Sequence, residues 1–170
     1  MKSTIVLCIL SVVFSRILSD PTYVGHALLV PIHQDVPLYE YLGDSVPSCF
    51  ITNDTICENY PLIAILSITD SMAYVCVDYP LGGPSKQGFM KTEYLGIRLA
   101  VYSDSVKVMS APSYSSRIAF TINNPQWGNM YRIYDAKEKW LLIQNLDNEC
   151  EKGWLAPEYQ CDNPYTTCRN

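Results

Sequence analysis

Short stretches of apolar or alternating residues recur along the chain, separated by residues that favour turns. The clearest are residues 106–109, 118–122, 130–134 and 140–143. Runs of about four to eight such residues, rich in branched and aromatic side chains, are typical of β-strands. Beyond the first twenty residues, no stretch shows the sustained apolar stripe of an amphipathic helix. The pattern therefore predicts an all-β fold.

The same pattern occurs twice in the same order, which predicts an internal duplication. Both copies open with Tyr, an aliphatic residue, Gly and an apolar strand, and both end with Gly, an aromatic residue and a later Tyr. The matches pair residues 23–30 with 94–101, 49–53 with 119–123, 74–77 with 140–143, and 88–94 with 153–159. We expect a first repeat at residues 20–96, and a second repeat with a C-terminal tail at residues 97–170.

Each repeat is small, and a lone core of about 70 residues is only marginally stable. Disulfides and packing of one repeat on the other are expected to supply further stability. The junction at residues 94–96 is short, which predicts that the two repeats touch. The glycines of the two endings, Gly88 and Gly153, are expected where the backbone bends or approaches a neighbour closely.

The first 19 residues have the pattern of a secretory signal peptide. Lys2 precedes an apolar run at residues 5–14, and Ser15 or Ser19 could precede the cleavage site. An uncleaved anchor is the alternative. Later stretches are too short or too polar to span a bilayer. We expect a secreted, extracellular protein with no membrane insertion after cleavage.

The two repeats differ in their net charge. After cleavage the chain has 10 basic and 17 acidic residues, a balance that argues against nucleic acid and anionic membranes as partners. Residues 20–96 hold nine acids and two lysines, whereas residues 97–170 hold eight acids and eight bases. If either repeat meets a basic partner, it is the first; solvated surface charge is the alternative.

Six cysteines remain after Cys8 leaves with the signal peptide, and an even count in a secreted chain favours disulfides. Sequence alone cannot choose among the fifteen connectivities. Short loops favour Cys49–Cys57 and Cys150–Cys161, which leaves Cys76–Cys168. A zinc site is the alternative, but the chain lacks a CxxC pair, and we expect neither a metal nor a cofactor.

The second repeat resembles a bacterial-type SH3 (SH3b) domain. Gly153-Trp154-Leu155 with Tyr159, preceded by residues 140–143, is similar to the closing part of that family. Residues 106–113 are similar to its opening strand and Ser-Pro-rich turn, although Lys107 and Met109 stand where Asn-x-Arg is usual.

The similarity extends to residues 131–135, which resemble the middle strand of SH3b domains. In the first repeat, residues 37–41 resemble the start of eukaryotic SH3 domains, which are normally intracellular. The resemblance implies two tandem small SH3-like β-barrels, from a family that mostly binds cell-wall peptides or glycans, or other proteins.

Catalysis is not expected. The only histidines are His26 and His33, and six cysteines in an oxidising compartment leave no free thiolate for a Cys–His pair. G-x-S-x-G is also absent. His26 is expected to be a partly buried, hydrogen-bonded histidine rather than a ligand, and His33 to be exposed in a polar turn. The acidic pairs Glu149/Glu151 and Glu40/Asp44 are expected to be solvated surface rather than glycosidase carboxylates.

Aromatic side chains are the better candidates for a binding site. Rings offer broad apolar area for sugars and prolines at little entropic cost. Core packing is the alternative, above all for Trp140 and Trp154. Trp127 lies in a polar loop and is the strongest candidate for recognition. The expected ligand-binding residues are Trp127, Tyr131, Tyr114, Trp154, Tyr39 and Tyr41.

The sequence thus predicts a secreted, non-catalytic protein that binds a cell-surface or cell-wall ligand, a peptide or a glycan, through loop aromatics. The alternative is an extracellular protein–protein module that docks a basic partner on the acidic first repeat. Asn53-Asp54-Thr55 is a glycosylation sequon, which predicts that Asn53 lies at the surface.

Overall fold

The computed structural model of the chain describes residues 23–30, 34–100, 104–126, 128–146, 148–165 and 168. These residues form β-strands and two single-turn 3₁₀ helices, which confirms the all-β prediction. No helix in this part of the chain is long and apolar enough to cross a membrane. The predicted signal peptide, His33 and Trp127 lie outside the described residues.

The strands are short, as the apolar pattern predicts. Those of the first half are β1 (Gly25–Leu29), β2 (Val36–Leu38), β3 (Cys49–Ile51), β4 (Leu62–Thr69), β5 (Met72–Asp78) and β6 (Lys86–Lys91), followed by the helix η1 (Thr92–Tyr94). Those of the second half are β7 (Leu95–Leu99), β8 (Ser105–Met109), β9 (Ile118–Asn123), β10 (Met130–Lys137), β11 (Trp140–Asn145) and β12 (Lys152–Leu155), then η2 (Pro157–Tyr159) and β13 (Gln160–Cys161).

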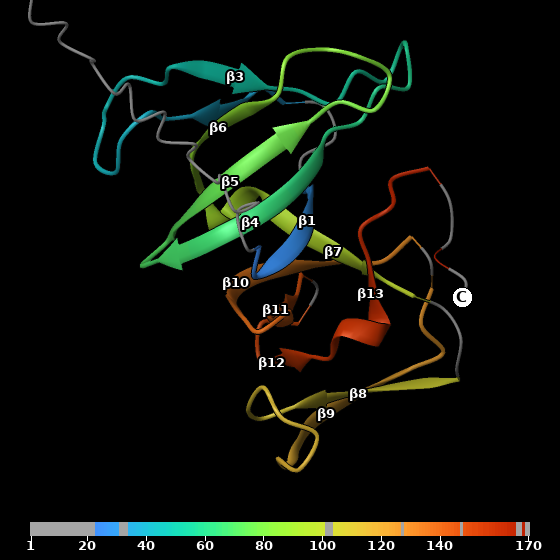
Figure 1. Cartoon of the computed structure of the whole chain (residues 1–170). Helices are drawn as coiled ribbons and strands as arrows, with labels where there is room; N and C mark the ends of the chain where they lie inside the picture. The colour runs from blue at the N-terminus through green and yellow to red at the C-terminus, as the bar shows by residue number, and fades with distance from the viewer. Residues whose placement is uncertain are drawn as a thin grey trace, which may run out of the picture.

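Eleven of these strands form one sheet, in the order β6-β5-β4-β1-β7-β10-β11-β12-β8-β9, with β13 paired to β7 beside this path. β2 and β3 form a separate antiparallel pair. The path is open, with β6 and β9 at its ends. Figure 1 shows β4–β6 towards one end of the molecule, β8 and β9 at the other, and β1 and β7 between them.

The pairing of β1 to β6 recurs in β7 to β12. In the first half β1 pairs with β4, β4 with β5, and β5 with β6; in the second half β7 pairs with β10, β10 with β11, and β11 with β12. The pairs β2–β3 and β8–β9 also correspond, and each contacts the last strand of its set through a single bridge, Tyr39 to Phe89 and Met109 to Trp154. Both sets have a register shift at the same place, near Ile65 and near Ile133.

β7 belongs to both sets. It follows η1 and pairs with β1, through Leu28 opposite Gly96, and it also pairs with β10 and β13. The expected boundary after residue 96 therefore falls inside this strand. The expected contact between the repeats is confirmed, because the β1–β7 ladder joins them.

The registers correct one part of the sequence alignment. Trp140 is opposite Lys137 at the start of its hairpin, and Met72 is opposite Thr69 in the corresponding place. Met72, rather than Tyr74, is thus the counterpart of Trp140. The expected alignment was wrong by two residues, which leaves every side chain on the same face because strands alternate with period two.

Gly88 and Gly153 are both sites of close backbone approach, as expected. A Cβ at Gly88 would lie 2.4 Å from the carbonyl oxygen of Tyr39, and one at Gly153 would lie 2.8 Å from that of Met109. A side chain has no room at either position. These contacts hold β6 against β2 and β12 against β8.

One large hydrophobic core includes residues of both repeats, and its fully buried members include Ile65, Ile97 and Leu141. Gly25 of β1 lies against Leu141 of β11, since a Cβ there would stand 2.7 Å from Cδ2 of that leucine. The backbone amide of Lys139 donates a hydrogen bond to the carbonyl oxygen of Val24, 3.0 Å away. The repeats are therefore packed together as one body.

The disulfide pairing differs from the expectation. Cys161 is bonded to Cys168, so the expected pairs Cys150–Cys161 and Cys76–Cys168 are wrong. Cys49 and Cys57 are also unbonded, as are Cys76 and Cys150. The bonded pair closes a shorter loop than any expected pair, with a sequence separation of 7, and the Cα atoms of Cys161 and Cys168 lie 5.4 Å apart. The preference for short loops was therefore sound, but it was applied to the wrong partners.

Candidate functional site

The predicted aromatic residues do not form one site. Tyr131 is a core residue, 3% exposed, so its expected role in ligand contact is wrong. Tyr39 is half-buried beside Phe89, and Tyr41 is 65% exposed in the loop between β2 and β3.

The second repeat brings together four aromatic side chains, of which Tyr114 is exposed, Trp154 and Tyr159 are partly buried and Trp140 is buried. Trp140 begins β11, Trp154 lies on β12, Tyr159 ends η2, and Tyr114 lies in the loop between β8 and β9. Trp154 and Tyr159 pack against the buried cluster of Met109, Trp140 and Ala156, in which Trp140 is 6% exposed. We call the four aromatic residues, together with Glu158, the aromatic surface.

Tyr114 is the accessible part of the aromatic surface, with 68% of the residue exposed. Its ring meets that of Trp140 edge-on, with centroids 4.8 Å apart and an interplanar angle of 64°. Its hydroxyl donates a 2.8 Å hydrogen bond to Oε2 of Glu158. This bond to a carboxylate raises the pKa of the Tyr114 phenol. The ring is therefore exposed and held in place.

The first repeat has no equivalent surface. Met72 occupies the position of Trp140 and Phe89 that of Trp154. The ring of Phe89 packs on Tyr74 instead, with centroids 4.9 Å apart. The two repeats share their strand pairing but differ in the side chains that they present.

A cavity of about 470 Å³ lies where the C-terminal tail meets the first repeat. The side chains of Leu62 and Ala64 on β4 form its apolar floor, whereas Ala27 on β1 and Ile63 on β4, which also line it, are 1% exposed and belong to the core. We call this the junction cavity. Its volume is within the range of about 300–1,000 Å³ that is typical of pockets for small ligands.

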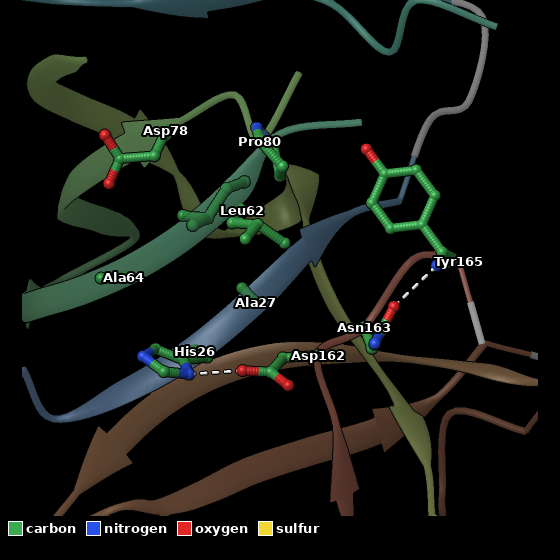
Figure 2. Close-up of a pocket in the computed structure, with 10 residues that line it drawn as sticks. His26, Ala27, Leu62, Ala64, Asp78, Pro80, Asp162, Asn163 and Tyr165 are labelled. Carbon is green, nitrogen blue, oxygen red and sulfur yellow. Dashed lines mark hydrogen bonds and ion pairs between the residues drawn. The ribbon is translucent and has the colours of Figure 1, made fainter. Parts of the chain in front are cut away.

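Polar groups surround the floor of the junction cavity. His26 and Asp78 come from the first repeat, and Asp162, Asn163 and Tyr165 come from the tail. Figure 2 shows Asp78 and Asp162 on different sides of the apolar floor, with the ring of Tyr165 beside it. Sequence reasoning missed the tail residues, because the polar segment after the last strand has no periodicity that places it.

The tail is anchored to both repeats. The backbone amide of Tyr60 donates a 3.1 Å hydrogen bond to the Tyr165 hydroxyl, and the two rings meet edge-on. Nη1 of Arg98 donates to the carbonyl oxygen of Pro164 at 3.4 Å. The tail thus lies back on the first repeat, as expected, but without the expected Cys76–Cys168 bond.

His26 and Asp162 join β1 to the tail. Nδ1 of His26 is hydrogen-bonded to Oδ2 of Asp162. This bond lowers the pKa of the Asp162 carboxyl, although burial acts in the opposite direction. The prediction that His26 is a partly buried, hydrogen-bonded histidine is confirmed, with Gly96 rather than Ile97 as its register counterpart in β7.

The other groups considered for chemistry have local roles. Oδ2 of Asp44 accepts a hydrogen bond from the Tyr41 amide, and Oε2 of Glu151 accepts one from the side chain of Asn145. Asp54 raises the pKa of the exposed Cys57 thiol through a hydrogen bond, which disfavours the nucleophilic thiolate. Over the described ranges, no three His, Cys, Asp or Glu side chains are grouped as metal ligands.

Asn53 of the sequon is only half-exposed. It lines a second cavity of about 200 Å³, together with residues that include Tyr60 and Arg98. The predicted surface position of Asn53 is therefore partly covered.

Comparison with known proteins adds no family. No protein-family model matches the chain, and no curated protein matches it significantly.

Proposed function

We propose that the protein is a secreted, non-catalytic binding protein built from two SH3-like units. Two observations support this reading. The second repeat has the sequence motifs that resemble SH3b domains, and the strand pairing of β7 to β12 repeats that of β1 to β6. The shared β7 would make the two units one rigid body rather than two independent domains.

The aromatic surface of the second repeat would bind a cell-surface or cell-wall ligand, a peptide or a glycan. The observation that supports this site is the exposed ring of Tyr114, held by Trp140 and Glu158. Aromatic faces stack on sugars and prolines. A ring that is already held loses little conformational entropy when it binds. Glu158 adds a carboxylate that can accept hydrogen bonds from a hydroxyl or an amide.

Tyr114→Ala tests this site directly. Retention of the oxidised chain would be measured on insoluble peptidoglycan, on chitin and on whole cells, at low and high salt. We expect retention on one of these surfaces to resist salt, because stacking depends little on ionic strength. Tyr114→Ala should weaken it about tenfold or more, the loss typical of a central aromatic contact.

Tyr41→Ala is the matched control, since Tyr41 is 65% exposed but belongs to the first repeat. It should leave retention unchanged. Equal losses in the two variants, or no retention on any surface, would contradict the proposed site. Trp127 is a sequence-based candidate outside the described residues, and Trp127→Ala can be measured in the same assay.

A further inference from the structure

The junction cavity combines features that suit one kind of ligand. Its floor offers the apolar side chains of Leu62 and Ala64 to a short chain of methylene groups. Lysine and arginine side chains bury such stems on apolar surface while their charged heads reach polar groups. The open cavity is thus shaped for an amphipathic side chain rather than for a wholly polar one.

Two carboxylates line the cavity and can bind the charged head of a lysine or arginine side chain. Asp78 and Asp162 both line the cavity, on different sides of its floor (Figure 2). Each carboxylate can accept several hydrogen bonds, so the bonds that Asp78 receives from Ser85 and Asp162 from His26 leave capacity for a further donor. The ring of Tyr165 offers a face to a cation at the tail side of the cavity.

The charge of the surrounding repeat favours the same ligand. Residues 20–96 carry nine acids and two lysines. Both lysines lie on β6, where Lys86 donates to the carbonyl oxygen of Phe50 and Lys91 pairs with Glu93. His26 is the one basic side chain that lines the cavity. A basic segment would therefore be attracted at long range, and none of the described residues that line the cavity is a lysine or an arginine.

We propose that the junction cavity binds a lysine or arginine side chain of a basic peptide segment. The stem lies on the floor beside Leu62 and Ala64, and the head binds Asp78, while Asp162 on another side of the cavity adds negative charge. This site lies on the opposite repeat from the aromatic surface and does not depend on it. The tail forms part of its wall, so the cavity exists only while the tail is folded back.

A matched pair of variants distinguishes binding inside the cavity from attraction by the overall negative charge of the first repeat. Asp78 and Asp70 lie at opposite ends of the β4–β5 hairpin, and only Asp78 lines the cavity. Asp78→Asn and Asp70→Asn remove the same charge from the same repeat, and asparagine tolerates the positive φ of position 70. Ala64→Phe fills the floor without changing the charge.

Binding of a fluorescent Lys/Arg-rich peptide to the full chain would be measured by anisotropy at low salt. The same peptide with acetylated lysines and with citrulline in place of arginine is the control for charge. We expect Asp78→Asn to weaken binding about three- to tenfold, as for a partly exposed charge pair. Asp70→Asn should change it less than about twofold. Ala64→Phe should abolish most of the binding, and Tyr114→Ala should leave it unchanged.

The proposal is overturned if the basic peptide does not bind, or if Asp78→Asn and Asp70→Asn weaken it equally. Unaltered binding to Ala64→Phe would also overturn it, provided that circular dichroism shows this variant folded. If Ala64→Phe does not fold, the comparison of the two aspartate variants decides alone. Binding at the aromatic surface has its own measurement, which is the loss of retention in Tyr114→Ala. The proposal for the aromatic surface and the proposal for the junction cavity can therefore be refuted independently.

Discussion

The turn of Glu138 and Lys139 shows how a single residue, Lys139, joins the two repeats. Both have positive φ, 50° and 70°, in the two-residue turn between β10 and β11. Turns of this kind usually contain Asn-Gly, because other residues are strained there. Lys139 nevertheless bonds to Val24 through its amide, accepts a hydrogen bond from Gln160, and places Nζ 5.1 Å from the ring centroid of Tyr23. These contacts offset the strain, and no local sequence signal could have predicted them.

The contact between His26 and Asp162 predicts a pH dependence of stability. The hydrogen bond keeps the pKa of Asp162 below its ordinary value in the folded protein. The contribution of this hydrogen bond to the free energy of unfolding is therefore complete at pH values above the carboxyl pKa of the unfolded chain, about 3.9. It is lost as the pH falls through the lower folded pKa. Because both side chains are partly exposed, with 39% and 45% accessible, we expect about 1 kcal/mol or less.

Urea unfolding of the natural chain and of Asp162→Asn would measure this contribution. The difference between their free energies of unfolding should be present near about pH 5 and should shrink by about pH 2.5. His26→Gln should remove the same pH-dependent part. A difference that stays constant over this range would show that the carboxylate charge of Asp162 does not stabilise the fold.

At the scale of elements, the two glycine contacts fix how the last strand of each set meets its neighbour. Gly153→Ala would place Cβ 2.8 Å from the carbonyl oxygen of Met109, and Gly88→Ala would place it 2.4 Å from that of Tyr39. Backbone atoms give way less easily than side chains, so we expect each to lower the free energy of unfolding by about 1–3 kcal/mol or more.

Gly128→Ala is the control, because a Cβ there meets nothing within 4 Å. It should change the free energy of unfolding by less than about 1 kcal/mol. Chemical denaturation of the three variants would compare them. If Gly153→Ala were as stable as Gly128→Ala, the close approach of β12 to β8 would not be a constraint.

Much of the element scale could be predicted from the sequence, because strands and duplications leave periodic patterns. The strands around residues 106–109 and 118–122 and the constraint on Gly153 all follow from such patterns. The candidate sites could be predicted only in part. Tyr114 was recognisable as a loop aromatic, whereas its contact with Glu158 depends on how η2 packs. The junction cavity depends on the path of the tail, which no periodicity encodes.

At the scale of the whole molecule, β7 decides how the repeats cooperate. It pairs with β1 of the first set and with β10 and β13 of the second. Its residues Ile97 and Leu99 are fully buried in the core that both repeats share. A strand with such partners cannot leave one repeat without unpairing the other. The chain should therefore unfold as one cooperative unit.

Cutting the chain tests this cooperation. A fragment of residues 20–96 ends inside β7 and lacks Ile97 and Leu99, whereas a fragment of residues 20–99 keeps the whole strand. Burial of each of these two side chains contributes about 1.5–3 kcal/mol, a large share of the stability of so small a unit. We expect residues 20–96 to be mostly unfolded by circular dichroism and residues 20–99 to be more ordered, while the full chain melts in a single transition. Two separate transitions of the full chain, or a fragment of residues 20–96 that folds by itself, would mean that the first repeat folds without the complete shared strand.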